Sequence, residues 1–402
     1  MLTYNDKVIA NNGCWMIPSQ QPSTLLPPYT IRYQFDNTFN PAYFSGPGAM
    51  HWNASNWTHV EDNVWDFCYP NANWHEAFLN ILPSANILDA NLRDVQVFDH
   101  AKISGRNVNV GSLLSVTDAH DCIVASESIT VGNIQTTSTA SNTFDRFLSG
   151  NATTVLIGDC VGVPQWDSQT FLDLTKCLNF VVGSMSGTSS LEYAFKHVGE
   201  QTNGRTKIVM GDLHDVESMS NLCQNNTGIQ SFNCGLTPKL TDVSSMFYMC
   251  SNLREGVDLY TSKVTNASKM YYYCTRLTNS PDYDFRSCLN FSDMFRDCTN
   301  LRQIPRFKYA NLSNANVSNM FFMTTPCRIE SGAYYLYACM SKNTNQATWN
   351  TVYGNNPPPY PPPEMATVAL GGNPYYPLGN VFTNRYQNQI ERNYIPTSWW
   401  RT

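Results

Sequence analysis

A spacing of 24 residues is the feature that most constrains this chain. Met246, Met270 and Met294 keep this interval, and each is followed four residues later by a cysteine and seven residues later by a leucine. Such fixed periods are typical of solenoids, whose units stack along one axis. A single unit cannot fold alone, because four or five buried apolar side chains contribute about 1.5–3 kcal/mol each, whereas ordering its backbone costs about 1–2 kcal/mol per residue. The spacing therefore predicts a stacked array that displays a surface, rather than a chain built around a catalytic pocket.

The positions within one unit predict its secondary structure. Met, Cys and Leu fall at i, i+4 and i+7, which is one stripe of a short helix. The serine two residues before each Met, such as Ser244 and Ser268, suits the N-cap of that helix. After the Leu, apolar residues alternate, as in Pro281 and Tyr283, with the period of a strand. The predicted fold class is α+β, a leucine-rich-repeat-like solenoid of helix-turn-strand units.

Four parts are predicted along the chain. Residues 1–90 form an aromatic-rich N-terminal β domain for entry or docking, because they hold several tryptophans within a short stretch. Residues 91–185 are β-rich and are either degenerate repeats or a separate β domain. Residues 186–328 form the solenoid. Residues 329–402 form a C-terminal cap that includes a proline-rich segment at 357–363.

Composition excludes several classes of protein. Charged residues make up 14% of the chain and the net charge is −6, with no cluster of Lys or Arg, which argues against nucleic-acid binding. No run approaches the 18 apolar residues of a membrane span. The first ten residues include Asp6 and Lys7 and show no signal peptide, so export by the ordinary route is not expected.

The cysteines are predicted to be structural. The chain has 13 of them, an odd number. Cys250, Cys274 and Cys298 occupy repeat positions that suit a small apolar side chain in a core. A disulfide ladder between stacked units is the alternative. No CxxC pair is present, so the sequence gives little support to a zinc site of that type.

The sequence contains two groups of residues whose side chains could form a chemical site. Glycan-cleaving spikes need two carboxylates that face each other across a groove, and Asp282 and Asp284 flank Tyr283 in one predicted strand. Neighbouring units place other charged or aromatic side chains at equivalent positions, so we expect a mixed-charge ladder rather than a general acid. This candidate binding surface comprises Asp258, Tyr260, Asp282, Asp284, Arg306 and Lys308.

The second group is Asp118, His120, Asp121 and Cys122, which are metal-ligand types. They are nearly adjacent in sequence, and alternating side chains of a strand would point apart. We therefore predict no metal site, no cofactor site and no catalytic residues, and the chain is not expected to be an enzyme.

The repeat resembles the BspA-type leucine-rich repeat, also described as the Mycoplasma-lipoprotein repeat. Residues 263–277 match its motif Asn-Val-Thr-Asn-Met-Ser-x-Met-Phe-x-x-Cys-x-x-Leu, with Lys263 for the first Asn and Ala267 for the first Met. The flanks are similar to a subset found in gut Bacteroidetes and their tailed phages, through the Trp-x-x-Ala-Phe stretch at 74–78, the Glu-Ser-Gly-Ala stretch at 330–333 and the Ile-Pro-x-Ser-Trp stretch at 395–399. Residues 91–185 depart from that pattern.

The resemblance implies a surface protein involved in adhesion. Combined with the absence of a visible export signal, it favours a structural protein of the phage virion, assembled in the host cytoplasm as a head or tail fibre or decoration. Its expected partners are capsid or tail proteins and a host-surface glycan or protein. Phage fibres are often trimeric, and the resemblance therefore implies a homo-oligomer, although no heptad run is present. The alternatives are a bacterial cell-surface adhesin and, with less support, a glycan-active tail spike.

Overall fold

The computed structural model describes residues 2–4, 7–11, 14–15, 26–40, 54–75, 85–140, 143–171, 173–310, 312 and 315–322. Backbone contacts divide the chain into two compact units, Met1–Val216 and Glu217–Thr402. The predicted C-terminal cap at 329–402, with its proline-rich segment, lies outside the described residues. None of the described residues belongs to a helix long and apolar enough to cross a bilayer.

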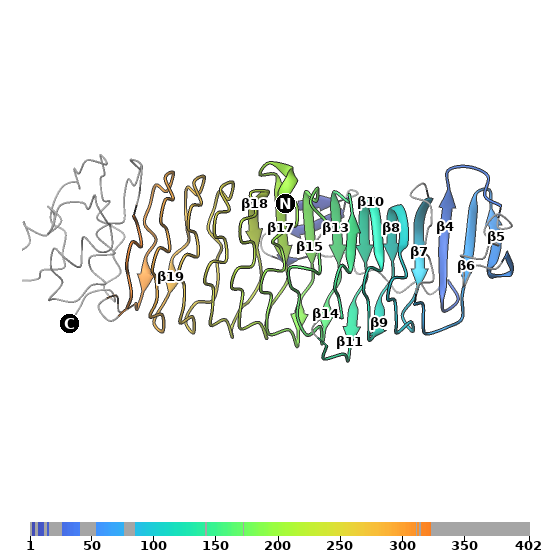
Figure 1. Ribbon diagram of the computed structural model, residues 1–402, viewed down its shortest axis with the longest axis horizontal. Helices are drawn as coiled ribbons and strands as arrows, with labels where there is room; N and C mark the ends of the chain where they lie inside the picture. Colours follow the sequence, from blue (N-terminus) through green and yellow to red (C-terminus); the bar gives the residue numbers. More distant parts are fainter. Residues whose placement is uncertain are drawn as a thin grey trace, which may run out of the picture. The chain divides into compact units, whose positions relative to one another are not determined.

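The first unit is a β-solenoid whose main wall is a parallel sheet. Its strands stand side by side in Figure 1 in the order β17-β15-β13-β10-β8-β7, and all of these neighbours pair in parallel. The bounds are β7 (Ala85–Asn91), β8 (Ile103–Val110), β10 (Ile123–Val131), β13 (Thr154–Ile157), β15 (Asn179–Val182) and β17 (Thr206–Met210). Short β12 (Leu148–Gly150) also pairs with β10. Valine and isoleucine point inward from these strands and are almost fully buried, as expected of strands with one face in a core.

A second, smaller parallel sheet forms another wall of the same unit, in the order β16-β14-β11-β9. These strands are β9 (Leu113–Val116), β11 (Ile134–Thr136), β14 (Cys160–Val161) and β16 (Met185–Ser186). Glycine turns the corner between the two walls. A Cβ atom on Gly158 would lie 2.8 Å from the backbone nitrogen of Asn133 in the preceding coil. The polar residue after each such glycine then links the coils, because the Asn133 side chain accepts a hydrogen bond from the Asp159 amide at 3.0 Å.

A group of antiparallel strands adjoins the parallel sheet at β7. β4 (Thr30–Phe35) pairs with β7 on one side and with β6 (Val64–Cys68) on the other, and β6 pairs with β5 (Trp57–Glu61). Trp57 packs between Tyr33 and Phe67, with ring centroids 5.6 and 5.0 Å apart. These aromatic side chains are therefore core. A separate antiparallel sheet is formed by β1 (Leu2–Tyr4), β2 (Lys7–Asn11) and β3 (Cys14–Trp15).

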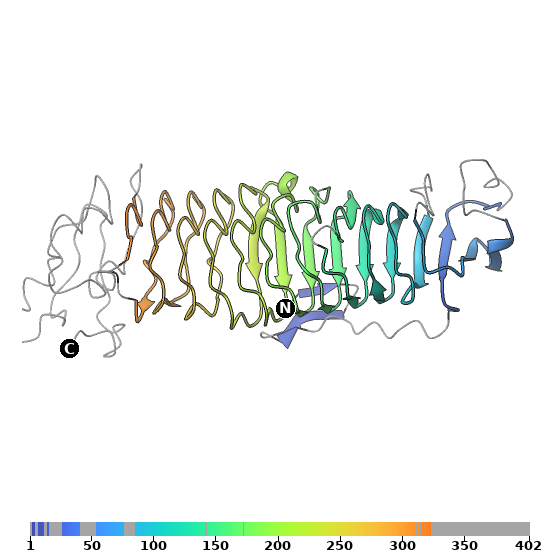
Figure 2. The same ribbon diagram turned by 60° about the horizontal axis from the view of Figure 1, so that its bottom comes forward.

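The second unit is also a β-solenoid, and its yellow to orange coils stand side by side in Figure 2. Its named strands are short: β18 (Ile229–Asn233), β19 (Tyr283–Asp284) and β20 (Phe307–Lys308), of which the last two pair in parallel. Isolated parallel bridges join Asp242, Asn266, Asn290 and Asn316 at equivalent positions of consecutive coils. The predicted stacking of units is therefore correct, whereas the α+β class with its helix-turn-strand unit is wrong. Within the described residues the helices are two 3-10 turns, η2 (Ala54–Asn56) and η3 (Glu200–Thr202).

The predicted helices fail because of two left-handed residues in each unit. Ser245 has φ 53° and Met249 has φ 58°, and Lys269 and Tyr273 repeat this 24 residues later. A left-handed residue interrupts an α-helix. Amides then alternate in their partners: Met246 donates to Val243 three residues back, whereas Phe247 donates to Met270 in the next coil at 2.9 Å. The segment is thus a flattened turn in which every second amide is used for stacking.

The serines predicted as N-caps have a different role. The side-chain oxygen of Asp242 accepts the Ser244 amide at 2.7 Å, and Asn266 accepts the Ser268 amide at 3.2 Å. The Asp or Asn two residues earlier thus forms an Asx-turn at the start of each corner. The repeated Asn-x-Ser pattern of the sequence encodes this corner instead of a helix.

The repeat cysteines lie in the core, as predicted, and Cys250 and Cys274 form no disulfide. The Cys274 thiol donates to the Phe247 carbonyl of the preceding coil, with sulfur and oxygen 3.1 Å apart, and Cys298 does the same to Tyr271 at 2.9 Å. Each thiol is therefore a second donor to a carbonyl that also accepts a backbone amide, since the Cys250 amide donates to Phe247 at 3.0 Å and the Cys274 amide to Tyr271 at 3.1 Å.

Burial should protect these thiols from alkylation. Loss of hydration raises the pKa of the Cys250 and Cys274 thiols well above the ordinary value, so almost no thiolate is present at pH 8. Iodoacetamide treatment of the folded protein, followed by digestion and mass spectrometry, is expected to label Cys68, which is half-buried, and to spare Cys250 and Cys274 until denaturant is added. Labelling of all three at one rate would contradict this core assignment.

Candidate functional site

The predicted binding surface lies on consecutive coils of the second unit. Asp282 and Arg306 contact each other: the carboxylate accepts the Arg306 amide at 3.0 Å and lies 3.3 Å from its Nε. Asp284 pairs in sheet register with Lys308 and forms an ion pair with Arg286. Asp258 and Tyr260 are exposed on the preceding coil. The structure thus brings Asp282 and Arg306 together, and it adds Arg286, which the sequence reading missed.

Tyr283, between the two aspartates, is fully buried and fastens this wall to the core. Its hydroxyl contacts the Tyr271 hydroxyl at 2.7 Å and donates to the Val257 carbonyl at 3.1 Å. Ser280 donates to the same hydroxyl at 3.0 Å. The two aspartates are therefore carried by a rigid strand, and each has an arginine beside it.

A second ladder of side chains occupies the outside of the flattened turns. The rings of Tyr248 and Tyr272 stack with centroids 4.8 Å apart. The next coils continue the ladder, because the Arg296 guanidinium lies 5.5 Å from the Tyr272 ring and 4.9 Å from the Phe322 ring. We call Tyr248, Tyr272, Arg296 and Phe322 the aromatic ladder. All four side chains are partly exposed, so they present a row of aromatic edges and one cation to solvent.

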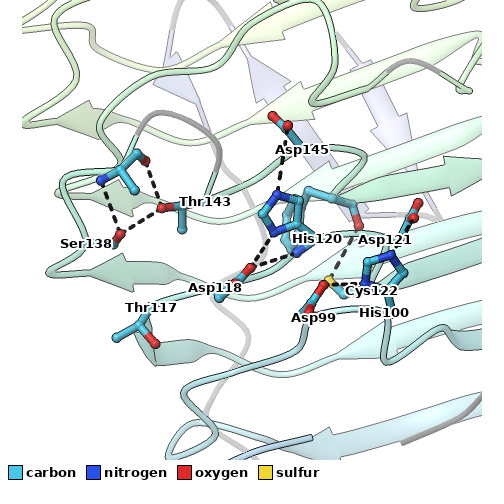
Figure 3. Close-up of polar contacts among 12 residues, drawn as sticks. Asp99, His100, Thr117, Asp118, His120, Asp121, Cys122, Ser138, Thr143 and Asp145 are labelled. Carbon is cyan, nitrogen blue, oxygen red and sulfur yellow. Dashed lines mark hydrogen bonds and ion pairs between the residues drawn. The ribbon is translucent and has the colours of Figure 1, made fainter. Parts of the chain in front are cut away.

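A cluster of histidines and aspartates forms at one corner of the first unit (Figure 3). Parallel bridges align Asn73 with Val97 and Val97 with Asp118, and the His100 and Asp121 amides donate to the His120 and Asp145 carbonyls of the following coils. Residues 20 to 24 apart in sequence therefore become neighbours. The cluster comprises His75, Asp99, His100, Asp118, His120, Asp121, Asp145, Arg146 and Asp173.

Acidic and basic side chains alternate along this cluster. Asp99 contacts His75 at 2.8 Å between Oδ2 and Nδ1, and it contacts His100 through its other oxygen. His100 lies 3.6 Å from Asp121. Asp121 in turn lies 3.2 Å from Arg146, which binds Asp173 at 2.7 Å. These hydrogen bonds and the adjacent carboxylates raise the pKa of Arg146.

A branch of the cluster is centred on His120. Its Nδ1 contacts Asp118 Oδ1 at 2.5 Å, and its Nε2 lies 3.9 Å from Asp145 Oδ2. Partial burial, together with the like charges of Asp167 and Asp118, raises the pKa of the Asp145 carboxyl. One ligand atom each from Asp99, Asp118 and His120 lie within 4.8 Å of one another. This branch is therefore a compact set of two carboxylates and one imidazole.

The structure separates the four residues that the sequence suggested as ligand types. Asp118 and His120 lie together, whereas Asp121 turns toward Arg146, and the buried Cys122 thiol donates to the Phe147 carbonyl at 3.5 Å. The expected divergence of adjacent side chains thus holds for Asp121 and Cys122. The sequence reading missed Asp99, which comes from the preceding coil. His75, Asp99, His120 and Asp145 follow one another at intervals of 24, 21 and 25 residues. These intervals are close to the repeat length, and they are the signal that could have found Asp99.

Comparison with known proteins gives one match. Residues 189–330 match the family described as "Mycoplasma protein of unknown function, DUF285". No curated protein and no solved structure matches the chain. The matched segment contains all the regular 24-residue repeats and covers less than half of the chain, so this part is similar to a Mycoplasma repeat family.

Proposed function

We propose that this chain is a non-enzymatic structural protein of a phage particle, of the BspA-like kind, which uses its repeat surface for assembly or host-surface contacts. The observation that carries the proposal is the aromatic ladder, in which equivalent positions of consecutive coils present tyrosine, arginine and phenylalanine to solvent. Tyrosine and arginine are enriched in protein interfaces, where they contribute a large share of the binding energy.

The rigidity of the coils supports a binding role. The ladder residues are adjacent in sequence to a buried stack of Phe247, Tyr271 and Phe295, whose neighbouring centroids are 5.6 and 5.2 Å apart. A side chain held by such a core loses little entropy when a partner binds. The mixed-charge row of Asp282, Arg306 and Arg286 adds polar groups that would orient the partner.

The environment of the aspartates speaks against glycan cleavage. A general acid needs a carboxyl whose protonated form is favoured by its surroundings. Asp282 and Asp284 each form an ion pair with an arginine, and neither contact resembles the apolar surroundings of a general acid. This arrangement supports a contact surface, and we therefore keep the glycan-active spike as the weaker reading.

Fractionation tests the proposal directly. Phage particles purified from cells that carry this gene, then analysed by quantitative mass spectrometry, are expected to contain the chain at a fixed copy number. Recovery in the bacterial envelope fraction, with none in purified particles, would overturn the virion assignment and favour the cell-surface adhesin.

Substitutions in the ladder test the binding surface. Replacing both Tyr272 and Arg296 by alanine should reduce incorporation into particles, or adsorption of particles to cells, by at least about tenfold, since each side chain of this kind contributes about 1–2 kcal/mol. Lys196→Ala is the matched control, because Lys196 forms a similar contact with Tyr193 at 5.8 Å in the first unit. Unchanged incorporation and adsorption in the double variant would exclude the ladder as the contact surface.

A further inference from the structure

We propose that Asp99, Asp118 and His120 bind a divalent transition-metal ion of the zinc class. The three side chains supply two carboxylate oxygens and one imidazole nitrogen, and these atoms lie within 4.8 Å of one another. Protein ligands lie about 2.0–2.2 Å from Zn²⁺ in tetrahedral geometry, so two ligand atoms on one ion are about 3.4 Å apart. Side-chain rotations that bring the most distant atoms closer by about 1–1.5 Å would complete a three-ligand site that leaves a position for water.

The chemistry of the ligands favours this class of ion. Imidazole together with carboxylate suits zinc and its first-row neighbours, whereas Ca²⁺ and Mg²⁺ prefer oxygen ligands alone. His120 Nδ1 and Asp118 Oδ1 already lie 2.5 Å apart, so an imidazole nitrogen and a carboxylate oxygen face each other where the ion would bind.

A second layer of contacts already orients the ligands. Asp145 Oδ2 lies 3.9 Å from His120 Nε2, on the side of the ring opposite the proposed metal. His75 Nδ1 lies 2.8 Å from Asp99 Oδ2, and His100 contacts the other oxygen, so two imidazoles hold this carboxylate in place. A carboxylate behind a metal-binding imidazole, and a hydrogen bond on a ligating carboxylate, are the usual outer contacts of metal sites. This second layer is the feature that a chance group of surface acids would not have.

The charge balance around the three ligands also favours a cation. Arg146 is the permanently charged cation of the cluster, and it is already paired with Asp121 and Asp173. Asp99, Asp118 and Asp145 face only histidines in the contacts of this cluster. A divalent ion would offset their charge.

The proposed ion would join two coils. Asp99 lies two residues after Val97, which bridges Asp118 of the next coil, so its carboxylate and the Asp118–His120 pair belong to successive turns of the solenoid. The metal would thereby act as a cross-link at a corner, and this role does not depend on the proposed binding function of the second unit.

Titration of the metal-free full chain with Zn²⁺ by calorimetry tests the site, with Co²⁺ absorption as a spectroscopic probe of nitrogen ligation. We expect one ion per chain, and a Co²⁺ spectrum that is lost in His120→Gln. Asp118→Asn should weaken Zn²⁺ binding at least about 100-fold. Asp145→Asn, which removes only the outer contact, should weaken it about 10–100-fold.

Two matched variants control for general surface effects. His197→Gln removes a histidine of equal side-chain exposure that contacts Glu200, and Asp173→Asn removes an aspartate paired with Arg146; neither should change the affinity. Circular dichroism of every variant without metal checks the fold. Absence of stoichiometric binding, or equal affinity in folded His120→Gln and the parent chain, would overturn the proposal.

Discussion

Replacing Phe295 by alanine is expected to lower the free energy of unfolding of the second unit by about 3–5 kcal/mol. The ring is fully buried and stacks between Tyr271 and Phe321, each with its centroid 5.2 Å away. Truncation removes contacts with two coils at once and leaves a cavity that the backbone hydrogen bonds between coils prevent from collapsing. Urea unfolding followed by circular dichroism measures the loss.

Phe322→Ala is the matched control for this prediction. Phe322 is next to the buried Phe321 but is only half-buried, on the outside of the turn. Its removal should cost about 1 kcal/mol or less, because solvent fills the space that it leaves. Equal losses for Phe295→Ala and Phe322→Ala would mean that the inner stack does not stabilise the coils.

Replacing Gly150 by alanine should destabilise the first unit by about 2–6 kcal/mol. Gly150 has φ +102°, a backbone conformation that costs an L-residue about 1–3 kcal/mol. A Cβ atom there would also lie 2.2 Å from the Ala125 carbonyl oxygen of β10, and such overpacking adds about 1–3 kcal/mol. Thermal unfolding monitored in the far ultraviolet should show the change.

The neighbouring exposed residue provides the control for Gly150. Asn151→Ala changes a solvent-facing side chain in the same turn and should shift stability by no more than about 0.5 kcal/mol. If Gly150→Ala unfolded at the same temperature as Asn151→Ala, the close approach of Gly150 to β10 would be wrong.

Much of the fold could be predicted from residue spacing. The 24-residue period implies stacked units, and the buried Met246, Cys250 and Leu253 confirm that these positions form the core. The sequence also predicts strands at 95–98, 123–125 and 153–157; the last two fall in β10 and β13, whereas 95–98 forms only isolated bridges at Val97. Repetition and apolar alternation are local properties, so they can be recognised in the sequence without a structure.

The helix prediction failed for a physical reason. Apolar residues at i, i+4 and i+7 suit a helix, yet the same spacing suits a flattened turn with left-handed residues at Ser245 and Met249. Whether a helix or a flattened turn forms depends on which carbonyl accepts the hydrogen bond of each backbone amide. In the structure Ser245 donates to Ser268 and Met249 to Tyr272, both in the next coil, and the sequence of one unit does not show that partner.

The two candidate sites also differ in how far the sequence could predict them. Asp282 and Arg306 could be placed together because they are separated by one repeat of regular length. Asp99 and His120 are 21 residues apart in the first unit, where the intervals vary, so their spacing was a weaker signal than a fixed period of 24. By itself, the sequence determined the stacking, the core positions and the wall that carries the charged ladder, since these follow from periodicity. Only the tertiary structure decided that the units are β-coils and that Asp99 meets Asp118 and His120, because both depend on hydrogen bonds and register between coils.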